Sequence, residues 1–143
     1  MNQGTKNLLK HYKFPFNHTV PAQKNVSFTA VNRACGDQIA LYAVVEQHTL
    51  KELFFQGKGC LYCIASASVL CQHMKNKELQ EAQEEVKNVR EWLLESDGKP
   101  PEGVSEEILA LGEIKTYPTR IPCADLAWKG LEELLKKYFL TEK

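Results

Sequence analysis

Apolar and polar residues alternate along two stretches in the first third of the chain. In residues 26–32, the apolar Val26, Phe28 and Ala30 alternate with hydroxyl residues, and in residues 38–45 every odd position is apolar. A period of two is typical of a strand that buries one face. A third extended stretch follows a short polar turn. The pattern predicts an antiparallel meander of three strands, at residues 26–32, 38–45 and 49–56.

Apolar residues recur at helical spacing outside this meander. The clearest case is residues 78–95, where Leu79, Val86 and Leu93 share one face and Glu and Gln occupy the rest. Further helices are predicted at residues 8–17 (ended by Pro15), just after Cys60, at residues 105–111, and from residue 122 or 123 to 139.

These elements predict one domain of the α+β class over residues 1–143, with an antiparallel sheet packed against several helices. Its N-terminal arm, residues 1–21, would carry the short first helix. Residues 96–119 contain several loop-forming residues and are expected to form a loop-rich insertion.

The composition is that of a globular protein with a core and no strong charge. Of 143 residues, 43% are hydrophobic, and 18 basic residues balance 18 acidic ones. A neutral chain gives no electrostatic reason to bind nucleic acid or an anionic membrane. The sequence shows no membrane-spanning stretch and no apolar core of a secretory signal near its start. We therefore expect a cytoplasmic protein without nucleic-acid or membrane partners.

Five cysteines are present, an odd number in a chain without an export signal. This favours reduced thiols with metal or sulfur chemistry over a disulfide framework. Three of them, Cys35, Cys60 and Cys123, are well separated, and each lies at a predicted turn or helix start. Asp37 follows Cys35 after Gly36, which lets the backbone turn tightly. Three thiolates and one carboxylate make a complete tetrahedral zinc site if the fold gathers them.

These residues stand in motifs that resemble those of the U-type iron–sulfur cluster assembly proteins, the SufU, IscU and NifU family. The matching segments are Cys-Gly-Asp-Gln-Ile at residues 35–39, Phe-Gln-Gly-Lys-Gly-Cys at 55–60, Ala-Ser-Ala-Ser at 65–68 and Arg-Ile-Pro-Cys at 120–123. The resemblance covers nearly the whole chain and implies the SufE/IscU-like fold. It is strongest to the SufU branch, because the stretch before Arg120 is long and Pro122 stands where the scaffold branch has a histidine.

Resemblance to SufU implies a zinc protein that accepts persulfide sulfur from a SufS-like cysteine desulfurase, a sulfurtransferase-like role, and works with downstream cluster-assembly proteins. The zinc ligands it implies are Cys35, Asp37, Cys60 and Cys123. We expect Cys35 to be the nucleophile, because a hairpin tip is the most accessible of the three cysteine positions. Arg120 is expected to place its charge near the thiolates without binding the metal itself.

Two other function classes stay open from the sequence. One is a scaffold that assembles a transient 2Fe–2S cluster on the same four ligands, and the other is a zinc-stabilised interaction domain without catalysis. Cys60 and Cys63 also form a Cys-x-x-Cys pair, which is a redox motif in thioredoxin-like proteins, but no βαβ pattern surrounds it. Cys71 is interpreted as a small buried hydrophobe.

Overall fold

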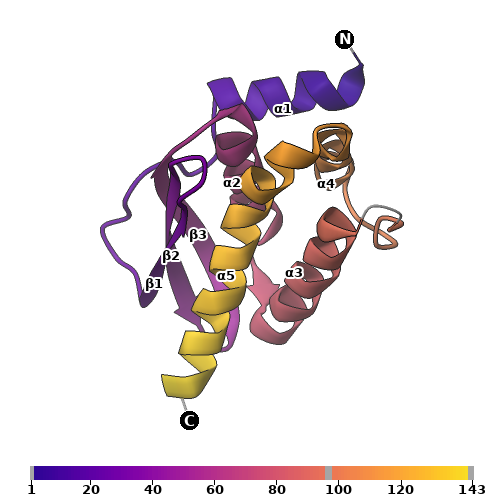
Figure 1. Ribbon diagram of the computed structural model, residues 1–143. Helices are drawn as coiled ribbons and strands as arrows, with labels where there is room; N and C mark the ends of the chain where they lie inside the picture. The colour runs from indigo at the N-terminus through magenta and orange to yellow at the C-terminus, as the bar shows by residue number, and fades with distance from the viewer. Residues whose placement is uncertain (1, 96–97, 142–143) are drawn as a thin grey trace.

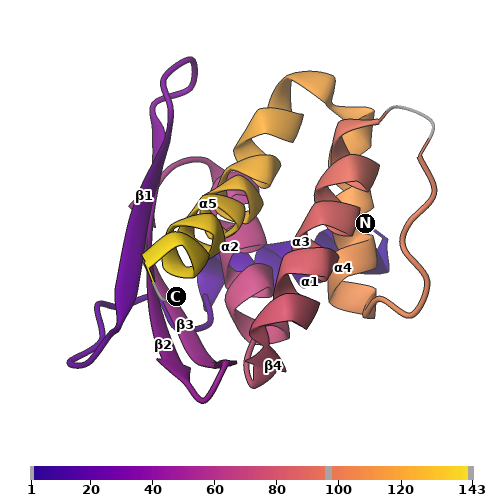
Figure 2. The ribbon, with the colours of Figure 1, turned by 90° about the horizontal axis from the view of Figure 1, so that it is seen from below.

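A four-stranded antiparallel sheet forms one layer of the molecule, and the helices lie against one of its faces (Figures 1 and 2). The computed structural model describes residues 2–95 and 98–141. In spatial order, which is also chain order, the strands are β1 (Val26–Asn32), β2 (Asp37–Glu46), β3 (Thr49–Lys58) and β4 (Lys77–Glu78). The first three form the predicted meander. The two-residue β4, which pairs with the start of β3, is too short to produce a sequence pattern.

Five α-helices and two short 3-10 helices make up the second layer, so the α+β class is confirmed. They are α1 (Gln3–Lys13), α2 (Leu61–His73), α3 (Leu79–Leu94), α4 (Glu106–Ala110), η1 (Leu111–Thr116), η2 (Pro118–Arg120) and α5 (Ile121–Thr141). No helix in the described ranges is both long enough and apolar enough to cross a membrane.

Helix α1 lies closer to the N-terminus than the predicted residues 8–17. It starts early because the side chain of Asn2 accepts a hydrogen bond of 2.8 Å from the backbone N–H of Thr5, which caps the first turn. It ends at Lys13 because Phe14, which precedes Pro15, has an extended φ of −131°. Pro15 therefore ends the helix as predicted, but the last helical residue is Lys13 and not Asn17.

The segment predicted as a loop-rich insertion contains α4, η1 and η2. Residues 96–97 of this segment, like residues 1 and 142–143 of the predicted domain, lie outside the described residues. Ser105 caps α4 by accepting a hydrogen bond from the N–H of Ile108. Ile108, Leu111 and Ile114 are fully buried, so this segment contributes side chains to the core.

The core lies between the sheet and helices α2 and α5. On β2, the inward-facing Ile39 and Leu41 are completely buried, as the alternation predicts. Helices α2 and α5 are joined through Ser66, whose Oγ donates to the carbonyl of Ala124 at 2.7 Å and accepts from the indole N–H of Trp128 at 2.9 Å. These bonds fix the two helices to each other, and with them the helix starts that carry Cys60 and Cys123.

Candidate metal centre

The hairpin between β1 and β2 presents Cys35 and Asp37 in opposite environments. Asn32 and Asp37 are paired across the hairpin, and Gly36 adopts the left-handed φ of 74° that the turn between them requires. Cys35 is exposed in this turn. Asp37 occupies the first position of β2 on the face that points toward the core, so its side chain is only 1% exposed.

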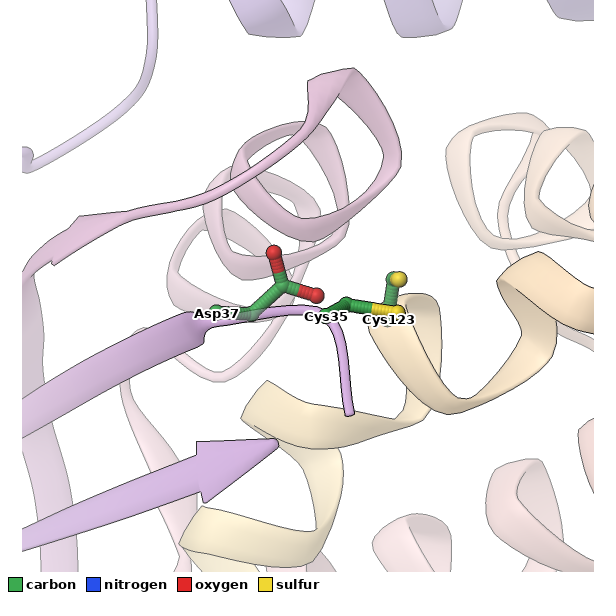
Figure 3. Close-up of side chains that lie close together, drawn as sticks. All are labelled: Cys35, Asp37 and Cys123. Atoms are coloured by element: carbon green, nitrogen blue, oxygen red, sulfur yellow. The ribbon is translucent and has the colours of Figure 1, made fainter. Parts of the chain in front are cut away.

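Three potential ligand atoms converge at this hairpin. The Sγ of Cys35, a carboxylate oxygen of Asp37 and the Sγ of Cys123 all lie within 4.8 Å of one another. Figure 3 shows the Asp37 and Cys35 side chains, from the hairpin, directed toward Cys123 at the start of α5. Cys123 is fully buried, so the group joins one exposed thiol to two enclosed ligands.

Cys60 adjoins this group without belonging to it at the 4.8 Å limit. It is partly exposed and precedes the first residue of α2. Its backbone N–H donates a hydrogen bond of 3.3 Å to Oδ1 of Asp37. The nearby Cys60 side chain is also one of the causes that raise the pKa of the Cys123 thiol. The structure therefore groups three of the four predicted ligands, and Cys60 contacts this group through its backbone N–H.

The pKa values of the enclosed thiols show how the site responds to charge. Burial raises the pKa of Cys123, and hydrogen bonding with Asp37 and the negative charge of Cys60 raise it further. Both effects disfavour a thiolate in the absence of a cation. A metal ion reverses this preference, because it binds the deprotonated thiols and releases their protons.

Arg120 lies at the end of η2 with its side chain exposed. Its proximity to the Cys123 side chain, and then to Cys60, raises the pKa of its guanidinium. A role for this charge beside the sulfur atoms stays a prediction.

Cys63 is a neighbour of the site to which the sequence analysis gave no role. Its pKa is raised to about 12, mainly by burial and then by the charges of Asp37 and Cys60. A Cβ atom at Gly59 would lie 2.9 Å from the Cys63 Sγ and 2.6 Å from Asp37 Oδ1, so Gly59 leaves the space that these two groups occupy. The Cys-x-x-Cys spacing was the sequence signal for Cys63, because it places both thiols on the first turn of one helix.

The donor set fits a metal ion of the zinc or iron type. Oδ2 of Asp37 is buried and has no hydrogen-bond partner among the residues that the structure describes. Such an oxygen is costly to bury unless a partner completes its coordination. A cation between the carboxylate and the thiols would be that partner, and thiolate with carboxylate ligands suits zinc.

Comparison with known proteins gives consistent matches. The family model for the NifU-like N-terminal domain matches residues 3–143. The iron–sulfur cluster assembly scaffold protein IscU of Thermotoga maritima is 36% identical over 107 residues, which are 74% of this chain and 73% of that protein. The zinc-dependent sulfurtransferase SufU of Bacillus subtilis is 31% identical over 132 residues, 91% of this chain and 87% of that protein.

Solved structures share the fold over almost the full length. A crystal structure from Fervidobacterium islandicum, described as a candidate scaffold protein of the SUF system (FiSufU), superposes with a TM-score of 0.83 at 28% identity, covering 91% of this chain and 94% of that one. The N-terminal part of a NifU-like protein from Brucella abortus gives a TM-score of 0.85 at 16% identity, covering 95% and 94%. The second match supports the fold alone.

Proposed function

This chain belongs to the family of NifU-like N-terminal domains, and we propose that it is a zinc-dependent sulfur acceptor of iron–sulfur cluster assembly, supplied by a cysteine desulfurase. The observation that carries this proposal is the exposed Cys35 thiol within 4.8 Å of the buried Asp37 and Cys123. A site that only stabilised the fold would gain nothing from an exposed ligand. We expect the protein to work in the cytoplasm, beside the desulfurase and downstream cluster-assembly proteins.

The residues that would hold zinc are Cys35, Asp37, Cys60 and Cys123. Three come from backbone positions that packing fixes, while Cys35 sits in a four-residue turn at the surface. Zinc, when bound, keeps its thiol ligands deprotonated near neutral pH. Of the four side chains, Cys35 can leave the group with the least disturbance of the core.

Sulfur transfer at Cys35 is a thiol exchange. The Cys35 thiolate attacks the terminal sulfur of the desulfurase persulfide, a new S–S bond forms on Cys35, and the original S–S bond breaks. The desulfurase cysteine departs as a thiolate, and Cys35 then carries the persulfide. We expect Arg120 to stabilise the negative charge that moves between these sulfurs, and the proximity of Cys123 and Cys60, which raises the pKa of its guanidinium, supports this role.

A second candidate function is that of a scaffold for a 2Fe–2S cluster on the same ligands. It is favoured by the 36% identity to the scaffold protein IscU of Thermotoga maritima. Pro122, directly before Cys123, has no side-chain donor that could serve as a ligand for such a cluster. For this reason we place the sulfur-acceptor function first.

The test combines metal analysis with desulfurase turnover. We expect about one zinc per chain, as a single four-ligand site requires, in protein purified without chelators. Added protein should stimulate a cysteine desulfurase and gain the mass of one sulfur atom. The variant Cys35→Ser should take up no sulfur, while Cys71→Ser, which alters a buried thiol in the same fold, should behave as the wild type. Bound iron with acid-labile sulfide and no stimulation would instead support the scaffold.

A further inference from the structure

The first turn of α2 carries two thiols that the sulfur-acceptor function does not use as a pair. Cys60 is the residue that caps the helix, and Cys63 is the third residue within it. Side chains three positions apart on a helix are neighbours. At a helix start the first of them is not yet constrained to helical geometry, since Cys60 has an extended ψ of 173°. The spacing and the free backbone of Cys60 therefore allow a disulfide to form within one turn.

The two thiols differ in access. Cys60 is partly exposed, whereas Cys63 is completely buried beneath it. A reagent from solvent would meet Cys60 first, and Cys63 would react from the inside.

Asp37 supplies a second, independent observation at this place. Its side chain is 1% exposed, Oδ1 faces Gly59 next to Cys63, and Oδ2 lacks a partner in the described part of the chain. With a cation bound, the carboxylate and thiolates share its charge. Without one, the buried carboxylate lies beside two thiols that no ion holds in place.

We propose that Cys60 and Cys63 form a disulfide when the site is metal-free, and that metal binding protects them, so that this pair is a redox-sensitive element beside the metal centre. The inference rests on the proposed function only where Cys60 is taken as a metal ligand.

The reaction requires an oxidant, for which we take a small-molecule disulfide of the glutathione class. The Cys60 thiolate attacks one of its sulfurs, so that a mixed disulfide forms and the first small thiolate leaves. The Cys63 sulfur then attacks Cys60, the intramolecular bond forms and the second small thiolate leaves. The two protons of the dithiol end on the two released thiols, so the protein pair is oxidised and the small disulfide is reduced.

Cys35 and Cys123 are the competing pair, because their sulfurs lie within 4.8 Å of each other. Their disulfide would join the hairpin to α5 through the fully buried Cys123, and an oxidant would reach the exposed Cys35 first. The Cys60–Cys63 closure needs a movement within one helical turn. Mapping of the bond separates the two possibilities.

The experiment compares wild type, Cys63→Ser and the matched control Cys71→Ser, each zinc-loaded and metal-free, during incubation with oxidised glutathione. Zinc content is measured first; free thiols are then alkylated and disulfides located by peptide mass mapping. Metal-free wild type and Cys71→Ser should show the 60–63 bond, whether or not the exposed Cys35 also carries glutathione. Metal-free Cys63→Ser should retain glutathione on Cys60, and zinc should slow thiol loss at least about tenfold. Cys63→Ala serves if the serine variant fails to fold.

Three results would overturn the inference: a bond between Cys35 and Cys123 in place of the 60–63 bond, no disulfide in the metal-free wild type, or equal oxidation with and without zinc. The first two leave the proposed function intact if about one zinc per chain was found beforehand, as the four-ligand site predicts. An absence of zinc from freshly purified protein, together with a mapped 60–63 disulfide after oxidation, would contradict the proposed function and leave the redox pair standing.

Discussion

The backbone N–H of Cys60 donates a hydrogen bond of 3.3 Å to Oδ1 of Asp37, and this bond joins the start of α2 to the start of β2. The other carboxylate oxygen, Oδ2, is buried without a partner among the described residues. One oxygen of Asp37 is thus occupied by the protein backbone, and the second is left for a ligand from outside the chain.

The substitution Asp37→Asn tests this division. The amide oxygen can still accept the Cys60 N–H, while the free oxygen is replaced by an NH₂ group that cannot bind a cation. We expect zinc affinity to fall at least about tenfold, measured by competition with a chromophoric chelator. The stability of the metal-free chain should change by less than about 1 kcal/mol in urea. Unchanged zinc affinity would show that Asp37 is not a metal ligand and serves only the turn.

Gly59→Ala should damage the metal site more than the fold. The added Cβ would lie 2.6 Å from Oδ1 of Asp37 and 2.9 Å from the Cys63 Sγ, so both side chains must move. We predict weaker zinc binding with a smaller loss of stability. Gly98→Ala is the control, because its Cβ would meet no described atom closer than 3.4 Å. Equal zinc affinity in the two variants would show that the space at Gly59 is not needed.

Arg120→Gln should reduce sulfur uptake about ten- to hundredfold while leaving zinc content unchanged. The reason is that its guanidinium interacts with the Cys123 side chain and with the charge of Cys60, but contributes no ligand. Arg120→Lys, which retains the charge, should recover part of the rate. Persulfide formed on Cys35 is quantified by mass after a short incubation with the desulfurase. A normal rate in the glutamine variant would mean that Arg120 is a surface residue without a part in sulfur transfer.

A buried polar cluster fastens α1 to the rest of the domain. Ser68 Oγ accepts a hydrogen bond of 2.7 Å from the N–H of Phe16 and lies 2.7 Å from Nδ1 of His11, whose Nε2 interacts with Glu107. Ser68→Ala should cost about 1–3 kcal/mol in the free energy of unfolding, because two buried groups lose their partner. A double-mutant cycle with His11→Ala should show coupling between the two positions. Additive losses would contradict a shared cluster.

His73 makes stability depend on pH. Burial lowers its pKa in the folded chain below the ordinary histidine value of 6.5, against the opposing effect of Glu85. As pH falls through that value, the unfolded chain takes up a proton that the folded chain does not, so stability decreases. His73→Gln should weaken this loss between about pH 7 and about pH 5. The free energy of unfolding of both proteins, measured in urea across this range, gives the difference, and parallel curves would exclude the residue.

The sequence predicted most of the architecture because its patterns are local. Strand β1 has the predicted bounds, and α3 begins and ends within one residue of residues 78–95. Helix α1 was misplaced because one cap at Asn2 moved its start, and a cap is a weaker signal than a long apolar stripe. Strand β4 is defined by its pairing with β3. A segment of two residues is too short to predict such a pairing.

The candidate site was predictable to the level of motifs and not of contacts. The order of the cysteines and the aspartate pointed to one group, and the structure brings Cys35, Asp37 and Cys123 together. The place of Cys63 beside Asp37 depends on how α2 meets β2, and the unpaired oxygen of Asp37 depends on what the fold leaves empty. Both depend on the packing between elements, which the spacing of residues along the chain does not predict.

The two halves of the site come from different layers of the molecule. Cys35 and Asp37 belong to the sheet, whereas Cys60 and Cys123 start two helices that Ser66 and Trp128 hold together. An ion bound by all four would cross-link the sheet to the helical layer. Its release would allow the hairpin to fluctuate while the helical layer stayed rigid. Hydrogen exchange in the 33–36 turn would therefore report whether the ion is bound. A partner protein could sense the loaded state through that same motion.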